Sequence, residues 1–222
     1  MYPEGYEPLS GRSSWVQRAL VAVIILEAFS ILSGYAAYSL YGHDVITQDE
    51  LDTTDIREGI ISVLHLLAFV VAIVFFIRWF GRAYRNLPAL GILTLRFRPG
   101  WTIWAWFVPL LGLWRPKQIA NDIWRGSDPD APPYQEWHGH PVPALFQWWW
   151  GVFIVSNILS NIALRAYWRA EDVPAYREAA RVYLVADSAG LIGAILALLV
   201  VRSTTARQEA RAARLAEASE TV

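Results

Sequence analysis

The chain has 222 residues, of which 55% are hydrophobic and 18% are charged, and it contains 12 tryptophans and no cysteine. This composition is poor for a water-soluble domain and typical of a helical membrane protein, because so many apolar side chains require an apolar environment. The formal net charge of −1 argues against nucleic-acid binding, and the lack of cysteine excludes disulfides, thiolate metal sites, iron–sulfur clusters and a cysteine nucleophile.

The first half of the chain predicts two membrane-spanning helices. Residues 1–14 are rich in Pro, Gly, Tyr and Ser and are predicted to form a disordered cytoplasmic tail. A nearly continuous apolar segment over 15–41 is long enough for a first span. Residues 42–57 carry several acidic side chains without apolar periodicity and predict a solvated loop. A second span is predicted over 56–86, because Pro88 cannot continue the helix.

The second half of the chain predicts two further spans. Apolar segments over 144–166 and 175–201 have the length of spanning helices, and the first of them carries three consecutive tryptophans typical of a membrane interface. The last residues, 203–222, are charged and predict a cytoplasmic tail. Together these segments predict one all-α integral membrane domain over 15–202 with four transmembrane helices.

Between the second and third spans lies an apolar run that is too short to cross a bilayer. Trp101–Trp114 has 14 residues, which is about 21 Å of helix against roughly 30 Å of hydrocarbon. Pro109 removes a backbone donor, Gly112 loosens the next turn, and Pro116 starts a new segment. We therefore expect a broken, re-entrant helical hairpin over 99–126, whose last part is an amphipathic helix in the membrane interface.

The distribution of Lys and Arg predicts the orientation of these helices. With a re-entrant hairpin and the N-terminus inside, 14 basic residues face the cytoplasm and 5 face outward, whereas a fully spanning hairpin gives 11 against 8. The five outward residues are Arg57, Arg165, Arg169, Arg177 and Arg181. We therefore expect four spans in the cell (plasma) membrane, with the N- and C-termini in the cytoplasm.

An ordered set of Arg, Trp, Pro and Gly residues runs from the end of the second span through the hairpin. Its members are Arg82, Tyr84, Arg85, Asn86, Leu87, Leu90, Gly91, Pro99, Gly100, Trp101, Trp106, Phe107, Pro109, Trp114, Arg115, Pro116, Ile123 and Trp124. In these residues and their spacing the chain resembles the domain-of-unknown-function 4328 family of uncharacterised actinobacterial membrane proteins. The family pattern predicts an asparagine at position 112, and this chain departs from it because it has Gly112 there. The resemblance implies a small multi-pass bacterial membrane protein and implies no activity.

Five polar side chains are expected inside the predicted spans, namely Glu27, His65, Asn157, Asn161 and Asp187. Charged residues in spans are costly and mark candidate functional positions. One interpretation is an intramembrane site for a proton, a cation or a small polar solute. The other is a set of buried residues that hydrogen-bond to one another and fix the helix register. A haem is not expected, since a single histidine lies in a span.

Basic and aromatic residues flank the predicted hairpin on its cytoplasmic side. They are Arg82, Arg85, Arg96, Arg98, Arg115, Lys117, Trp101, Trp114 and Trp124. They serve either as orientation signals and helix-end anchors, or as a face that binds anionic lipid headgroups or an acidic partner. Arg115 is expected to be the structural anchor, so that Arg115→Lys weakens folding or lipid retention while Arg211→Lys in the tail is silent.

The remaining motifs predict no catalytic centre. His138 and His140, with Glu136 and Asp130 nearby, are interpreted as solvated loop residues and not as metal ligands. The sequence carries no nucleophile-elbow, phosphate-loop or zinc-protease motif, so an enzyme is not favoured and no cofactor is expected. Two classes of function remain. The first is a scaffold, accessory or sensory subunit that binds lipid or a membrane or cytoplasmic protein partner, and the second is a small transporter or channel that uses the polar cluster.

Overall fold

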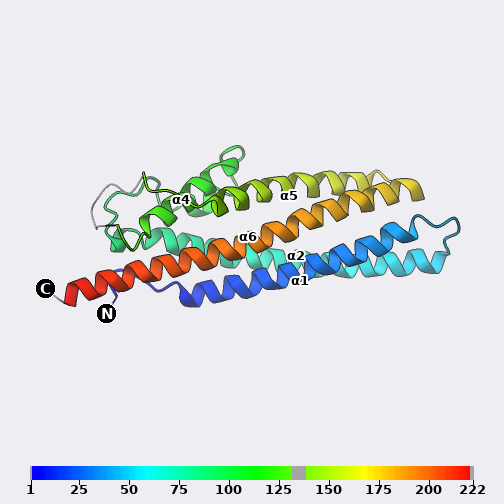
Figure 1. Ribbon diagram of the computed structural model, residues 1–222. Coiled ribbons are helices and arrows are strands. Elements are labelled where there is room, and N and C mark those ends of the chain that lie inside the picture. The colour runs from blue at the N-terminus through cyan, green and yellow to red at the C-terminus, as the bar shows by residue number, and fades with distance from the viewer. Residues whose placement is uncertain (1, 132–138, 221–222) are drawn as a thin grey trace. The chain divides into compact units, whose positions relative to one another are not determined.

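The computed structural model of this chain describes residues 2–131 and 139–220 (Figure 1). Within these residues it contains helices and no strand, which confirms the predicted all-α class. The elements are α1 (Ser10–Leu40), α2 (Gln48–Arg85), the 3-10 helix η1 (Pro88–Leu90), α3 (Trp101–Trp104), the 3-10 helix η2 (Leu111–Leu113), α4 (Arg115–Gly126), α5 (Ala144–Trp168) and α6 (Val173–Glu220).

Three of the long helices, α1, α2 and α6, could cross a membrane by their length and composition. Only 6% of the most apolar stretch of α2 is buried inside the protein, so nearly all of it is at least partly exposed. Helix α5 is 25 residues long, but Gln147, Asn157, Asn161 and its tryptophans lower its mean hydropathy. The three apolar helices indicate a helical membrane protein.

The chain packs as two compact units. Unit 1 comprises Met1–Arg18, Ile73–Trp148 and Leu198–Val222, and unit 2 comprises Ala19–Ala72 and Trp149–Ala197. Each boundary falls inside a long helix, so that α1, α2, α5 and α6 contribute residues to both units. The units are therefore defined by how side chains pack and not by linkers in the chain.

The core of unit 1 forms around the last turns of α2 and the apolar face of α4. Phe80 and Leu87 are almost completely buried. Gly126 of α4 lies against Leu87, where an added Cβ would be 2.8 Å from Leu87 Cδ2. Ile119 and Ile123 are buried on the same side of α4. The apolar face of α4 is thus covered by protein, so the protein core accounts for the amphipathic pattern of this helix.

The end of α6 belongs to the core of unit 1 and is not a free tail. Gln208 is completely buried. Its Nε2 donates to the carbonyl of Ala83 and to Ser127 Oγ, each at 3.0 Å, and its Oε1 accepts from Asn86 Nδ2 at 3.0 Å. Buried polar groups are stable only when they are paired in this way. The stretch 203–222, expected to be a charged tail, therefore continues α6 as a packed helix up to the last described residue.

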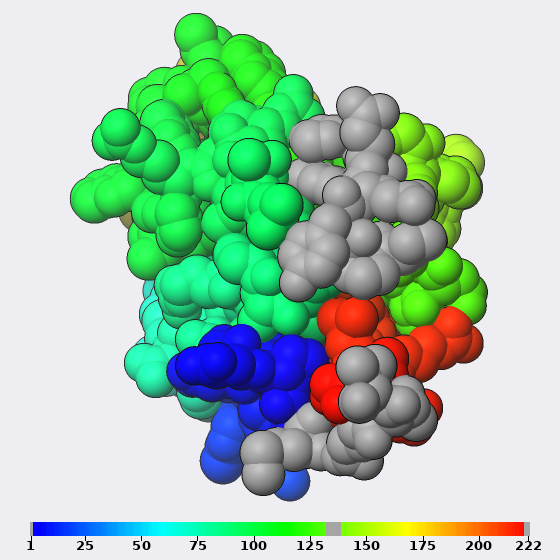
Figure 2. Space-filling model, turned by 90° about the vertical axis from the view of Figure 1, so that its left-hand side faces the viewer, coloured from blue at the N-terminus to red at the C-terminus, as the bar shows by residue number. Residues whose placement is uncertain are grey.

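The N-terminal residues are also packed into unit 1. Tyr6 and Leu9 are buried, and Glu209 Oε1 accepts hydrogen bonds from the N–H groups of Leu9 (2.6 Å) and Ser10 (3.2 Å). A carboxylate at this place caps the free N–H groups at the start of α1. Figure 2 shows the N-terminal segment beside the end of α6. The predicted disordered tail over 1–14 is corrected accordingly, since apolar side chains and a cap fix the residues from 6 onward.

In unit 2, helix α2 begins earlier than expected. The N–H and Oγ1 of Thr47 donate to Glu50 Oε2 at 2.8 and 2.7 Å, and the N–H of Glu50 donates to Thr47 Oγ1 at 3.3 Å. This reciprocal arrangement is a capping box, and acidic residues in the first turn are favoured by the helix dipole. Much of the stretch 42–57, expected to be a solvated loop, therefore forms the first turns of α2.

The expected hairpin consists of two short helical turns followed by α4. Leu110 has φ 63° and ψ −52°, and the N–H of the residue after it donates to the carbonyl of Pro109 at 2.7 Å, which makes a tight γ-turn. Gly112 lies in η2, directly after this turn. Pro116 lies in the first turn of α4, where its missing N–H costs nothing. The apolar run 101–114 is therefore not one helix.

Unit 2 packs its helices closely through small residues. A Cβ on Gly34 of α1 would lie 3.4 Å from Leu184 Cδ2 of α6, and a Cβ on Gly193 of α6 would lie 3.6 Å from Val152 Cγ1 of α5. These are ordinary contact distances for a side chain, so the helix backbones approach one another closely at these glycines. Such small-residue contacts are typical of helix packing in membranes.

Candidate functional site

Large apolar side chains are exposed along the segment between η1 and α4 in unit 1. Leu93 is 75% exposed and Leu110, at the γ-turn, is 71% exposed. We call the set the apolar ridge, and its members are Leu93, Ile103, Trp104, Phe107, Leu110, Leu113 and Trp114. This part of the chain forms a protruding region of the face shown in Figure 2. Exposed apolar side chains that gather in one short segment outside the long apolar helices are typical of a surface that contacts lipid or another protein.

Exposed arginines accompany the ridge. Arg85, Arg96 and Arg98 are exposed, and the Arg96 guanidinium lies 5.0 Å from the centre of the Phe97 ring. The Arg115 guanidinium also lies over the Phe97 ring, 4.4 Å from the ring centre. Stacking holds an arginine in place while leaving its N–H groups free for an anion.

Four further members of the expected basic face have different surroundings. Arg115 also stacks on Trp101, which is half-buried, at 5.3 Å. Lys117 is half-buried, and burial followed by the charge of nearby Arg125 lowers its pKa. Trp114 is exposed and belongs to the ridge. Arg115 and Trp101 therefore lie near the exposed Arg96, and Trp114 and Lys117 flank Arg115 in the chain.

Two residues of the expected basic face are structural instead. Arg82 pairs with Glu7 of the N-terminal segment at 2.9 Å. Trp124 lies under the guanidinium of Arg207, 4.4 Å from the ring centre, and beside the ring of Phe146. Both side chains are engaged in packing within unit 1. This corrects their assignment to a lipid or partner face, because their charges and rings already have partners in the protein.

Asp122 is a buried acid on α4. Its side chain is completely buried, and neither carboxylate oxygen has a hydrogen-bond partner among the described residues. Burial raises the pKa of Asp122 to about 6, although the charges of Arg96 and Arg125 oppose the rise. An ionised carboxylate at this place is costly. Asp122 therefore takes up its proton at mildly acidic pH.

We expect Asp122 to make the protein less stable as the pH rises from 4 to 6. In that window the folded state, with its pKa of about 6, binds more protons than the unfolded chain, so stability falls with pH, by up to about 3 kcal/mol in total. Asp122→Asn should abolish this part of the pH dependence. Unfolding by denaturant in detergent across this range measures it. The exposed Asp44→Asn is the control, and an unchanged pH dependence in Asp122→Asn would contradict the assignment.

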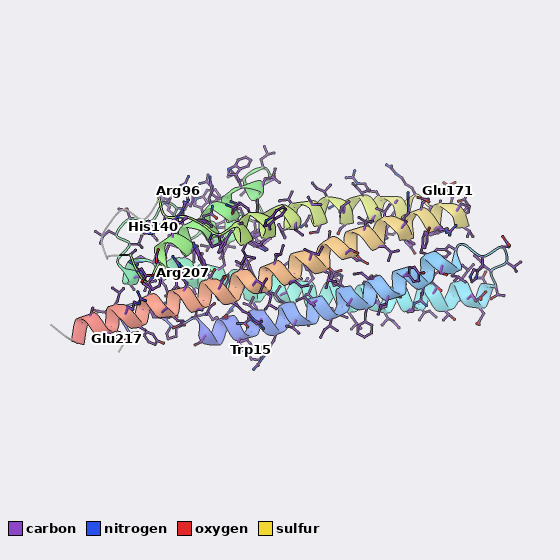
Figure 3. The ribbon with its side chains drawn as sticks, in the orientation of Figure 1. Trp15, Arg96, His140, Glu171, Arg207 and Glu217 are labelled. Atoms are coloured by element: carbon purple, nitrogen blue, oxygen red, sulfur yellow. The ribbon has the colours of Figure 1, made fainter. Side chains whose placement is uncertain are left out.

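A second polar group of unit 1 ties the loop after α4 to α6. Asp128 Oδ2 lies 2.9 Å from Arg207 Nη2 and 3.2 Å from His140 Nδ1. Burial opposes ionisation of Asp128, but hydrogen bonds from the Asp130 N–H and His140 and the charge of Arg207 together lower its pKa. Figure 3 shows His140 and Arg207 near α4. Asp128 therefore remains an anion that holds this loop.

Arg211 completes this arrangement. It is 2% exposed, and its Nε and Nη2 donate to the Leu90 carbonyl at 2.9 and 2.8 Å. Its Nη1 donates to the carbonyls of Asp128 and Ala131, the latter at 3.1 Å. Sequence reasoning missed Arg211 because the charged composition of residues 203–222 predicts a solvated tail. The planar fork of donors makes Arg211, and not Arg115, the residue on which backbone carbonyls converge.

The histidine pair considered as a metal site is only partly described. His138 and Glu136 lie outside the described residues. Among the residues that are described, no group of three or more His, Asp or Glu side chains is placed to hold a metal ion. The backbone carbonyl of His140 accepts from Arg125 Nε at 2.8 Å, so His140 contributes to the loop that Asp128 holds.

In unit 2 the structure brings together three of the five polar residues expected in the spans. Glu27 of α1 is 6% exposed, and its Oε1 lies 3.2 Å from Nε2 of His65 on α2. Asp187 of α6 is within electrostatic reach of both. Asn157 and Asn161 do not join this cluster, because their side chains are exposed and donate to carbonyls of their own helix, Phe153 and Asn157, at 2.7 and 2.9 Å. Back-bonding of this kind satisfies an exposed amide locally.

Sequence reasoning also missed a polar group at the start of α2. Arg57 Nε donates to Ser33 Oγ at 2.7 Å, and Ser33 Oγ donates to Glu58 Oε1 at 2.5 Å. Ser33 is buried. The adjacent Arg57 and Glu58 at the beginning of a predicted span could have indicated it, since charges there need partners.

One comparison with known proteins gave a match. The sequence model of a family described as a domain of unknown function, DUF4328, matches residues 43–206. The chain belongs to this family. The DUF4328 region includes the apolar ridge, α4, His65 and Asp187, and it leaves out Glu27 and the end of α6 from Arg207. A search of curated proteins and a search of solved structures each found no match.

Proposed function

We propose that this DUF4328 protein is a multi-pass membrane protein that binds anionic lipid headgroups through a basic, tryptophan-rich face and acts as a scaffold, accessory or sensory subunit for a membrane or cytoplasmic protein. The observation that carries the proposal is the apolar ridge next to the exposed Arg85, Arg96 and Arg98. A surface that pairs exposed apolar side chains with cations matches the boundary between acyl chains and phosphates.

The topology proposed with this function has four spans, α5 being the fourth. It places both termini on the cytoplasmic side of the plasma membrane, and it is supported by the 14 to 5 distribution of basic residues. The segment between η1 and α4 then re-enters the membrane from the cytoplasmic side, as its short apolar run favours. In this placement the ridge reaches the acyl chains and the arginines meet the phosphates.

The backbone of the ridge adds support. A non-glycine residue with positive φ is rare and costs about 1–3 kcal/mol, so it is retained where it has a role. Leu110 has φ 63° and carries one of the exposed side chains of the ridge. The turn directs this side chain away from unit 1. We infer that the turn allows Leu110 to enter the acyl-chain region while the chain reverses direction.

The test is a double substitution, Arg96→Gln with Arg98→Gln. Each cation near an anionic membrane surface contributes about 1 kcal/mol, so the double variant should bind phosphatidylglycerol roughly 30-fold more weakly than the unaltered protein. Binding is measured on purified protein in a neutral detergent, with phosphatidylcholine as the zwitterionic comparison. Both arginines are exposed, so the substitutions should leave folding intact.

A matched control and a test of sidedness accompany this measurement. Arg165→Gln with Arg169→Gln removes two exposed arginines near the exposed Trp168 in unit 2, and it should leave lipid binding unchanged. Equal losses in the two double variants would show a general effect of charge and would overturn the proposal. Because the protein has no cysteine, Arg98→Cys can be labelled with an impermeant thiol reagent, and labelling from the outside of intact cells would contradict the proposed topology.

A further inference from the structure

We propose that Glu27, His65 and Asp187 form a proton-binding site inside unit 2, in which the three side chains share a proton. The proposal does not depend on lipid binding, since the basic face consists of unit 1 residues. The sequence left a proton, a cation and a small polar solute open as ligands. The packing around Glu27 distinguishes between them.

The carboxylate of Glu27 is closed in by the backbone of α6. A Cβ on Gly190 would lie 2.4 Å from Glu27 Oε1 and 3.0 Å from its Cδ. The carboxylate therefore occupies space that the side chain of any other residue type at position 190 would fill. A bound cation needs several oxygen ligands around it, and a solute needs a cavity. No metal-holding group of acidic and histidine side chains occurs in the described part of the chain, and a proton needs no such space.

The hydrogen bonding of the pair leaves positions for a proton. Glu27 Oε2 and His65 Nε2 are buried and have no hydrogen-bond partner among the described residues. The 3.2 Å between His65 Nε2 and Glu27 Oε1 is an ion-pair distance at which the ring and the carboxylate are not aligned as a hydrogen bond. Leaving a buried carboxylate oxygen without a donor is costly. A proton on the carboxyl group or on the imidazole removes that cost.

Asp187 supplies a second acid on the side of α6 that meets Glu27. It lies three residues before Gly190, so the two positions share one face of the helix. Asp187 is within electrostatic reach of Glu27 and His65. Two carboxylates within electrostatic reach of one imidazole inside a helix bundle are disfavoured when both are ionised and no proton is nearby. The proton therefore belongs to the cluster and not to one side chain.

Other ionisable groups near the cluster do not supply a free positive charge. Glu58 of α2 acts on Asp187, but it pairs with Arg57 at 3.4 Å. Tyr183 of α6 lies within electrostatic reach of Asp187 and adds no positive charge. The charge of the cluster is therefore set by its own two acids and its histidine, together with the proton they hold.

Infrared difference spectroscopy during a pH titration tests the proposal on the full-length protein in lipid nanodiscs. A protonated carboxylic acid has a carbonyl stretching band that a carboxylate lacks. The unaltered protein should show this band from a buried, pH-dependent carboxyl group. Glu27→Gln or Asp187→Asn should remove it, because each variant takes away one of the two acids that share the proton.

A control separates the cluster from other acids of the same helix. Glu178→Gln alters an acid with a 63% exposed side chain in an exposed ion pair on α6, and it should leave the band unchanged. If one core variant fails to fold, the other is used, together with labelling of the unaltered protein by a hydrophobic carbodiimide, which should modify Glu27 or Asp187. The proposal is overturned if the band persists in the core variants, or if the unaltered protein shows neither the band nor the labelling.

Discussion

Arg211→Lys is expected to lower the free energy of unfolding by about 3 kcal/mol, although lysine keeps the positive charge. The guanidinium of Arg211 donates to the carbonyls of Leu90, Asp128 and Ala131 from a position that is 2% exposed. A lysine ammonium is a single point of charge and cannot reach three carbonyls with the same geometry. At least one buried carbonyl would lose its donor.

Arg214→Lys, three residues further along α6, is the matched control. Arg214 pairs with Asp130, and both side chains are exposed, so the substitution should change stability by less than about 1 kcal/mol. Unfolding in detergent measures both variants. Arg115→Lys should have an intermediate effect, because it weakens the stacking on Phe97 and Trp101. An effect of Arg211→Lys no larger than that of Arg214→Lys would refute the anchoring role.

Gly190→Ala is expected to destabilise the protein by about 1–3 kcal/mol, which is the usual cost of overpacking. The new methyl group would lie 2.4 Å from Glu27 Oε1, so the carboxylate or the backbone of α6 has to move. Because Glu27 is buried, it has little room to do so. The change in thermal stability is measured in detergent, and Glu27→Ala combined with Gly190→Ala should relieve the clash.

Gly193→Ala is the control for this substitution, since it lies three residues later on the same helix. Its Cβ would meet Val152 Cγ1 at 3.6 Å, which is an ordinary contact. Alanine also favours helix over glycine by about 1 kcal/mol. Gly193→Ala should therefore be neutral or slightly stabilising. If the two alanine variants behaved alike, the close contact between Gly190 and Glu27 would have to be abandoned.

Properties that depend on neighbouring residues could be predicted from the sequence. The long apolar stretches predict helices, and the all-α class is confirmed. The ordered residues between Arg82 and Trp124 identify the DUF4328 family, which is also confirmed. The break at Pro109 follows from the missing backbone donor of proline, and the structure has a γ-turn there. Each of these inferences needs only the residues within a few turns of helix.

The sequence could not predict which polar side chains have partners in the folded protein. Arg82 and Trp124 are among the residues in which the chain resembles the family, but contacts with Glu7 and Arg207 place them in the packing of unit 1. Asn157 bonds to its own helix and so does not join Glu27 and its neighbours. Periodicity gives the face of a helix on which a residue lies, but the element opposite that face is set by tertiary packing.

Hydropathy and composition were enough to predict a helical membrane protein. Only the tertiary structure showed that the two ends of the chain are packed against the rest of unit 1. Leu9 meets Glu209 across 200 positions of sequence, and Arg211 meets Leu90 across 121. Taken locally, both ends have the polar composition of solvated tails. They are ordered because the N–H groups at the start of α1 and the carbonyls of Leu90, Asp128 and Ala131 need partners, and Glu209 and Arg211, which folding brings close, supply them.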